Sequence, residues 1–481
     1  MSSLKFKQMS KGFRTFQAAL NTWDTQLYFP TPTSFLQDWE NNIQDSQKRF
    51  KATTPSQRAA LLLRVASFLQ QDKLDIQEVY CRESGLSKER FESEFARLTN
   101  TIFVFAEHIQ QFSWQKQNIL PLENKTLLKK RMALGPVLVL GSSNFPLAYS
   151  TMGGDTTAAL AAGCCVVVKA HPMHVGTSLA VANCVKRALQ ELNLPDRIFS
   201  HVIDNTYAWA TTFAKHPQIQ AIGFTGSIKG GRALMDLAAQ RPRPIPVFAE
   251  MGSLNPVVIC SDLQIGQIET IAQQLARSIC TDAGQFCTKP GLLLVDATHF
   301  ETFKKLLLEA LATLVAVPML HPDIYQKFEA RKRQVFQVKG VKPYQSNVNQ
   351  DGLKGLWGIA QTTPELLLIE STLLEEVFGP FAVLSPFENE NVLQPLFEKM
   401  NGQLTISIFT NNALDIHPVL THFIEEKVGR AIINGVPTGV SVIEAMHHGG
   451  AYPASSDARF TAVGPDSILR FTKEVCWQLH Q

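Results

Sequence analysis

The sequence predicts an α/β protein that contains parallel β-sheets. Between residues 133 and 260, short apolar segments alternate with helical segments of about 10–15 residues, which is typical of parallel βαβ units. A second alternation of this kind follows residue 287, and residues 1–114 show the apolar spacing of helices. These observations predict two α/β regions, with a helical N-terminal region packed on the first.

The N-terminal region is expected to be mostly helical. Apolar residues recur at helical spacing through residues 56–84 and again through residues 87–112. Ser87, followed by Glu89 and Arg90, resembles a helix start. A helix is therefore expected to begin at Ser87.

The first α/β region has apolar strand candidates separated by helical segments. Near-continuous apolar strands fit a sheet that is covered on both faces. Strands are expected within residues 133–143, 164–172, 198–204 and 219–227, with one or two more within 246–260, and helices within 150–163, 177–193 and 230–240.

The second α/β region follows Cys287. Its main segments are residues 291–296, a helix at 301–314, and the apolar stretches 365–370, 381–387, 404–410 and 430–437. The chain ends on a short segment of alternating apolar and polar residues, 472–481. This alternation is typical of a strand.

Composition limits the classes of function. The 481 residues are 45% hydrophobic and 18% charged, with a formal net charge of +3, which is ordinary for a globular protein and offers no basis for nucleic-acid binding by bulk charge. No apolar run approaches the roughly 18 residues of a membrane span, and the N-terminus lacks the apolar centre of a secretory signal. We therefore expect a cytoplasmic protein without membrane or nucleic-acid partners.

The eight cysteines include no CxxC pair, so the sequence predicts no metal site. Cys287 is distinctive because it lies between a helical segment and an apolar strand, close to Gly284 and Pro290. A thiol on such a loop can be a nucleophile if a neighbouring group takes its proton. Packing in the protein core is the alternative interpretation, because most buried cysteines do only that.

Two further polar residues stand at the ends of apolar strands. Glu250 precedes a glycine at the end of one, where a carboxylate is costly to bury unless it has a function or a partner. Asn144 follows another, and ligands bind at the carboxyl ends of strands in open α/β sheets. The alternatives are a glutamate paired with a lysine and an asparagine that forms a turn.

A weaker pattern concerns phosphate binding. Gly226 and Gly231 lie between a strand and a helix, and helix N-termini accept phosphate groups, although the spacing is neither GxGxxG nor a Walker loop. Lys169 follows a strand in the same region. It could contact a nucleotide or be a solvated lysine at a strand end.

Taken in order along the chain, these residues and the segment EEVFGPF resemble the NAD(P)-dependent aldehyde dehydrogenase superfamily from about residue 50 to 475. The stretches around residues 146–178, 241–257, 284–292 and 447–464 are most similar to its NADP-preferring branch. That branch includes the α-ketoglutaric semialdehyde (2,5-dioxovalerate) dehydrogenases and a Vibrio fatty aldehyde dehydrogenase. The resemblance implies a Rossmann-like cofactor domain and an α/β catalytic domain with a small oligomerisation arm.

The resemblance also implies roles for the catalytic residues. Cys287 would attack the aldehyde to form a thiohemiacetal, and Asn144 would hold the oxyanion with the Cys287 backbone N–H. Hydride loss would leave a thioester, and Glu250 would activate the water that hydrolyses it. A partly apolar site is expected to raise the pKa of Glu250 toward neutrality.

The implied cofactor is NADP. Residues matching the family's cofactor contacts are Lys169, Gly226, Ser227, Gly231, Glu376 and Phe378. Where NAD-preferring relatives carry a glutamate, this chain has Pro172, and the absence of a carboxylate removes a barrier to the 2′-phosphate. Lys169 and His171 could then meet that phosphate. Proline permits NADP without excluding NAD.

The resemblance divides the chain into three parts. Residues 1–250 would contain the helical region and the cofactor domain, with an oligomerisation hairpin at about 115–133. Residues 251–440 would form the catalytic domain, and residues 441–481 would return to the cofactor domain and add an oligomerisation strand. An isolated hairpin is marginal in water, so a homodimer is expected, and a homotetramer would also satisfy the arm.

The best interpretation is a 2,5-dioxovalerate dehydrogenase that uses NADP. A fatty or general aldehyde dehydrogenase is an alternative, as is a CoA-acylating relative, although Glu250 favours hydrolysis by water. A non-catalytic binding relative belongs to a different class, and the presence of both Cys287 and Glu250 argues against it.

Overall fold

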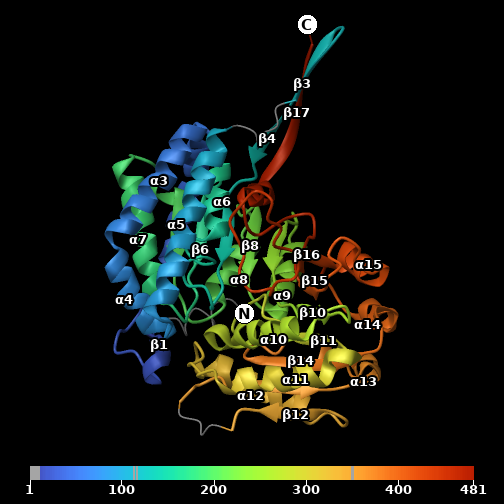
Figure 1. The fold of residues 1–481 in the computed structure, drawn as a ribbon. Coiled ribbons are helices and arrows are strands. Elements are labelled where there is room, and N and C mark those ends of the chain that lie inside the picture. The colour runs from blue at the N-terminus through green and yellow to red at the C-terminus, as the bar shows by residue number, and fades with distance from the viewer. Residues whose placement is uncertain (1–10, 112–113, 115–117, 348–351, 481) are drawn as a thin grey trace.

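A computed structural model describes residues 11–111, 114, 118–347 and 352–480 (Figure 1). In this part of the chain, no helix is both long enough and apolar enough to cross a membrane. Two large sheets, each with helices packed against it, make up most of the molecule, and a narrow three-stranded arm projects from it.

Helices dominate the N-terminal region, as the sequence predicts. Ser87 caps α5 by accepting a hydrogen bond from the Arg90 backbone N–H, so the predicted helix start is confirmed. The strands and α-helices within residues 11–111 are β1 (Phe16–Gln17), β2 (Thr22–Trp23), α2 (Ser34–Lys51), α3 (Pro55–Gln71), α4 (Lys73–Ser84) and α5 (Lys88–Gln110).

The first large sheet has five parallel strands in the order β7-β6-β5-β8-β9. Its apolar side chains share one core with the N-terminal helices. The strands are β5 (Val137–Leu140), β6 (Val166–Lys169), β7 (Phe199–Val202), β8 (Ala221–Thr225) and β9 (Val247–Glu250). The helices between them are α6 (Gly154–Ala162), α7 (Val175–Glu191), α8 (Ala208–Lys215) and α9 (Ile228–Ala239).

The second large sheet has seven strands in the order β12-β13-β14-β11-β10-β15-β16, and all neighbours are parallel except β12 and β13. Residues alternate along its strands between two apolar cores, one on each face. The strands are β10 (Pro256–Ile259), β11 (Leu292–Asp296), β12 (Lys342–Gln345), β13 (Gly358–Gln361), β14 (Phe381–Phe387), β15 (Gln403–Phe409) and β16 (Val428–Ile433).

Helices cover both faces of this second sheet. On one face, α10 and α11 share a core with it, and on the other face the core includes residues of α12 to α15. The helices are α10 (Ile265–Cys280), α11 (Ala297–Ala312), α12 (Pro322–Phe336), α13 (Pro364–Ile369), α14 (Gln394–Lys399) and α15 (Pro418–Lys427). Short 3₁₀ helices are η2 (Ala18–Leu20), η4 (Asp196–Ile198), η5 (Thr281–Gly284), η6 (Ser371–Leu374), η7 (Glu390–Leu393) and η8 (Pro465–Phe471).

The arm joins segments from opposite ends of the chain. β3 (Asn118–Leu122) and β4 (Lys125–Ala133) form an antiparallel hairpin, and β17 (Thr472–His480) pairs antiparallel with β4 (Figure 1). Just before β17, Ile468 and Phe471 pack in the core of the five-stranded sheet. The C-terminal segment therefore returns to the first α/β region before it enters the arm.

Candidate active site

The loop that carries Cys287 has an unusual backbone. Asp282, Ala283 and Gly284 have positive φ angles of 47°, 55° and 64°, a conformation that non-glycine residues seldom adopt. A Cβ at Gly284 would collide with the Gly379 backbone, so no larger residue fits there. Such strain persists only where the surrounding structure enforces it. The surrounding structure therefore holds the thiol loop in one conformation ahead of β11.

Helix α5 holds this loop against the first sheet. The Arg90 guanidinium forms ion pairs of 2.5 Å with Asp282 and 3.0 Å with Glu94. The buried Glu94 carboxylate also accepts hydrogen bonds from the backbone N–H groups of Leu147 and Ala148, just after Asn144. One buried charge network therefore fixes both the Asn144 segment and the Cys287 loop.

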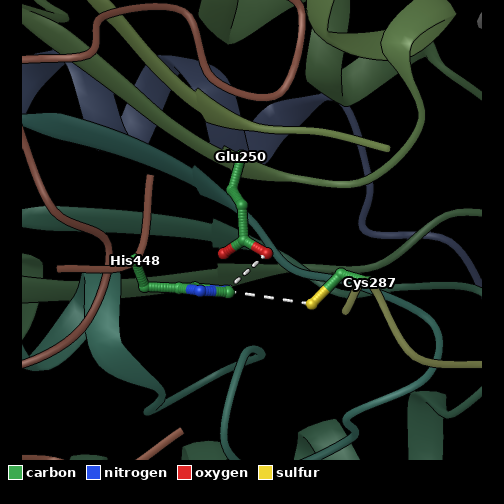
Figure 2. Close-up of side chains that lie close together, drawn as sticks. All are labelled: Glu250, Cys287 and His448. Carbon is green, nitrogen blue, oxygen red and sulfur yellow. Dashed lines mark hydrogen bonds and ion pairs between the residues drawn. The ribbon is translucent and has the colours of Figure 1, made fainter. Parts of the chain in front are cut away.

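Three side chains from distant parts of the sequence converge at the loop. Glu250 ends β9, and His448 lies on the segment between β16 and η8. His448 Nε2 lies 2.9 Å from Glu250 Oε1 and 3.8 Å from Cys287 Sγ (Figure 2). Glu250 is 4% exposed and His448 is 0% exposed, so water screens these interactions weakly.

The hydrogen bond to Glu250 fixes the role of one ring nitrogen of His448. A carboxylate is only an acceptor, so Nε2 carries the proton that it shares with Oε1. Among the described residues, the buried Nδ1 of His448 and Oε2 of Glu250 have no hydrogen-bond partner. Glu250 Oε2 is therefore an unused acceptor in the cluster.

The neighbours of Glu250 shift its pKa in the direction opposite to the one expected from the sequence. Burial favours the neutral acid, but His448 and the hydrogen bonds from His448 and Cys287 outweigh it, so the pKa of Glu250 lies below its usual value. The predicted rise toward neutrality is therefore wrong. Burial raises the pKa of the Cys287 thiol well above its ordinary value, and the Glu250 carboxylate adds to this rise as the next largest cause. At neutral pH the thiol keeps its proton and Glu250 is ionised.

The same atoms form a set of potential metal ligands. One donor atom each from Glu250, Cys287 and His448 lies within 4.8 Å of the other two. Sulfur, imidazole nitrogen and carboxylate oxygen are all ligands of zinc. The sequence predicts no metal at this position.

Asn144 lies beside the thiol loop. Its Nδ2 donates a hydrogen bond of 2.8 Å to the backbone carbonyl of Gln285, two residues before Cys287. A side-chain amide has two N–H groups, so the second one is available to another acceptor.

The predicted phosphate-binding segment forms the start of α9. Ser227 is its N-cap, and its hydroxyl accepts a hydrogen bond from the Gly230 backbone N–H. A Cβ at Gly231 would collide with Met251 Sδ, so this glycine permits close packing of α9 on β9. Gly226 donates its backbone N–H to the Glu250 carbonyl, which links this turn directly to the Cys287–Glu250–His448 cluster.

Lys169 and His171, at and just after the end of β6, already interact with neighbouring side chains. Lys169 Nζ forms a buried ion pair of 2.8 Å with Asp204 Oδ1. The ring of His171 stacks on that of His174 at 5.3 Å, and burial lowers the pKa of His171 well below its ordinary value. His171 is therefore neutral at physiological pH, and the charge of Lys169 is matched by a carboxylate that the sequence analysis missed.

Within the EEVFGP segment, the side chain of Glu376 is partly buried. Burial raises the pKa of Glu376 to about 7, although the Lys289 charge opposes the shift. Burial likewise lowers the pKa of Lys289 to about 8, and its ammonium donates a hydrogen bond of 2.6 Å to the Phe381 carbonyl. A Cβ at Gly252 would collide with Glu376, so Gly252 provides the space that Glu376 occupies. Phe378 lies two residues beyond Glu376 and is also partly buried.

Sequence reasoning missed His448 as a member of the site. The residue lies within the stretch 447–464, which carried part of the family resemblance, but no local pattern marks it as a partner of Glu250. A histidine beside glycines is an ordinary loop residue in sequence terms, so only the three-dimensional arrangement identifies it.

Comparison with known proteins matches residues 36–473 to a single family model, that of the aldehyde dehydrogenase family. The chain belongs to the aldehyde dehydrogenase family. This match confirms the resemblance and the predicted fold class, and it supports an aldehyde dehydrogenase activity. The family uses NAD or NADP as its cofactor.

Two α-ketoglutaric semialdehyde dehydrogenases are similar to the chain over most of its length. An α-ketoglutaric semialdehyde dehydrogenase of Acinetobacter baylyi is 36% identical over 447 residues, covering 89% of this chain and 84% of that protein. An α-ketoglutaric semialdehyde dehydrogenase 2 of Azospirillum brasilense is 34% identical over 446 residues, covering 90% of this chain and 85% of that protein.

Solved structures share the aldehyde dehydrogenase fold at lower identity. A Thermus 1-pyrroline-5-carboxylate dehydrogenase with bound NAD has a TM-score of 0.85 at 15% identity, over 98% of this chain and 90% of that one. Proline utilization A from Bdellovibrio bacteriovorus has a TM-score of 0.84 at 19% identity, over 98% of this chain. The chain spans 48% of that longer protein.

Proposed function

We propose that this aldehyde dehydrogenase oxidises α-ketoglutaric semialdehyde (2,5-dioxovalerate) to the dicarboxylic acid, with NADP as the hydride acceptor. The observation that carries the chemistry is the contact of Cys287, Glu250 and His448 in one buried cluster. The names of the two relatives at 36% and 34% identity support the choice of substrate.

In the first step, Cys287 Sγ attacks the aldehyde carbon, and the thiol proton passes to solvent water, so Glu250 stays ionised for the later hydrolysis. Proton transfer must accompany the attack because the pKa of the thiol is raised. Asn144 Nδ2 and the Cys287 backbone N–H stabilise the developing oxyanion of the thiohemiacetal. The His448 hydrogen bond orients the Glu250 carboxylate for its later role as the base for water.

The cofactor supplies the acceptor for the hydride that leaves the thiohemiacetal carbon. The start of α9 suits its pyrophosphate, because Ser227 and Lys229 are exposed there at a helix N-terminus. Glu376 and Phe378 would hold the nicotinamide riboside. Gly226 and Gly231 keep α9 close to β9 and so position that N-terminus.

Loss of hydride leaves a thioester on Cys287. Glu250 then takes a proton from water, which attacks the thioester carbonyl, and the carboxylic acid leaves as the thiolate is released. A thiolate both attacks and leaves readily, so one residue serves both halves of the reaction.

The choice of NADP rests on Pro172. No carboxylate stands at that position to repel a 2′-phosphate. The Lys169–Asp204 ion pair and the neutral His171 weaken the positive charge available there. NAD is therefore the alternative acceptor, and we propose a preference for NADP rather than exclusive use of it.

One assay distinguishes the candidate functions. The purified protein is given NADP or NAD with α-ketoglutaric semialdehyde, a short neutral aldehyde or a long-chain aldehyde, each with and without CoA. The highest kcat/KM is expected for the semialdehyde with NADP, independent of CoA. A higher value for the long-chain aldehyde would identify a fatty aldehyde dehydrogenase. A requirement for CoA would identify the acylating reaction, and no turnover at all would favour the binding relative.

We also propose a homodimer or homotetramer assembled through the arm. The exposed apolar side chains of the arm include Ile119, Leu120, Leu122, Trp477 and Leu479. A projecting sheet with exposed apolar residues is marginal in water unless another surface covers it (Figure 1). The arm of a second copy, related by two-fold symmetry, would cover these apolar residues.

A further inference from the structure

Two arginines border the active site without an acidic partner. Arg97 lies on α5, and Arg430 lies on β16. Among residues 11–111, 114, 118–347 and 352–480, no carboxylate forms an ion pair with either guanidinium. Both side chains are partly buried. A partly buried charge without a counterion is costly, so each site favours an anion.

Both arginines bind the same stretch of backbone, residues 437–440. Arg97 donates to the Val440 carbonyl, and Arg430 donates to the Pro437 and Gly439 carbonyls at 2.8 and 2.9 Å. These contacts place two guanidinium groups, one from the N-terminal helical region and one from the second large sheet, around one loop. They leave further N–H groups on each guanidinium, including the buried Nε of Arg430, which has no partner in the described part of the chain.

Both arginines contact residues near His448, the histidine that lies against the thiol. Arg97 Nη2 donates to the Tyr149 hydroxyl at 2.8 Å, and the Tyr149 ring lies 6.3 Å from the His448 ring, which contacts Cys287 Sγ. Arg430 also contacts Met446 Sδ, two residues before His448.

We propose that Arg97 and Arg430 bind the carboxylate of an aldehyde substrate whose carbonyl faces Cys287. The inference rests on the proposed function and specifies how a carboxylated aldehyde is recognised. A guanidinium fork matches a carboxylate in geometry and charge, whereas a neutral aldehyde of the same length leaves both charges unpaired. The site therefore selects for substrates with an acid group at the far end.

The test compares paired substrates in Arg97→Met and Arg430→Met variants. Succinic semialdehyde and butanal have the same carbon number and differ in the carboxylate. KM for succinic semialdehyde is expected to rise by about 10- to 100-fold, with kcat less affected and butanal kinetics nearly unchanged. Arg97→Lys should recover part of the loss. Arg241→Met is the matched control, because Arg241 is a buried arginine that donates to the Ala214 and Ile219 carbonyls.

An equal loss for both aldehydes would show that the arginines only brace the loop, and it would overturn the proposal. Unchanged kinetics for both aldehydes in the arginine variants would also overturn the proposal. A second readout needs no turnover: glutarate should protect Cys287 from alkylation by iodoacetamide in the wild type but not in the Met variants. If α-ketoglutaric semialdehyde is not oxidised but glutarate still protects, the carboxylate site stands and the proposed function fails. If the semialdehyde is oxidised but the arginine variants show no change in selectivity, the proposed function stands and the carboxylate site fails.

Discussion

Glu250 and His448 are 198 positions apart in the sequence, and His448 Nε2 lies 2.9 Å from Glu250 Oε1. Both side chains are buried, and the thiol of Cys287 lies 3.8 Å from the same histidine nitrogen. The carboxylate therefore has a fixed direction and a lowered pKa, while the nearby thiol has a raised one. This arrangement makes the transfer of the thiol proton part of the attack on the substrate.

Cys287→Ala should abolish aldehyde oxidation, by about 10³-fold or more, because no other nucleophile replaces the thiolate. NADP binding, measured by fluorescence titration, should remain largely intact. Cys476→Ala is the control, since that thiol is exposed on the arm. Retained turnover in purified Cys287→Ala would return Cys287 to a packing role.

Glu250→Gln should give a rapid burst of NADPH and then fail to turn over, because hydride loss precedes the step that needs a base for water. Steady-state kcat should fall by about 10²- to 10⁴-fold. Stopped-flow absorbance at the NADPH band measures both phases. An equal loss of the burst would show that Glu250 is already required when the thiol attacks.

The rate of Cys287 alkylation by iodoacetamide should rise with pH, and its midpoint should lie above the ordinary pKa of a thiol. The sign follows from burial and from the Glu250 charge, since both disfavour the thiolate. Glu250→Gln removes the charge, so the midpoint should move to lower pH. Slower alkylation of this variant at neutral pH would instead show that Glu250 assists loss of the thiol proton in the resting enzyme.

Asp204→Asn should increase the preference for NADP over NAD, on the order of tenfold in the ratio of kcat/KM values, because it releases the charge of Lys169. The asparagine oxygen can still accept the hydrogen bond that Thr206 donates to this side chain. Asp196→Asn, an exposed substitution, is the control. An unchanged ratio would mean that Lys169 does not face the 2′-phosphate.

Deletion of residues 472–481 should weaken the dimer, because β17 pairs with β4 along the arm. Light scattering at micromolar concentration should show a larger fraction of monomer than in the wild type. Lys473→Ser, an exposed change that keeps the strand, is the control. A wild-type mass of 53.4 kDa, that of one chain, would contradict assembly altogether.

The sequence by itself determined the fold class, because secondary structure leaves a local periodic signal. The apolar run of β6 predicted a strand buried on both faces, and Ser87 marked the start of α5. The loop of Cys287 and the strand end of Glu250 were recognisable because each is a short contiguous segment. The predicted domain boundaries near residues 250 and 440 stay predictions.

Only the tertiary structure decided which distant groups meet and how they titrate. His448, the Asp204 partner of Lys169, and the arginines at 97 and 430 carry no local signal, because their roles arise from packing between segments far apart in the chain. The expected rise in the Glu250 pKa considered burial alone. The structure added a histidine and a thiol as hydrogen-bond donors, and their combined effect outweighs desolvation because both lie within a buried site of low dielectric.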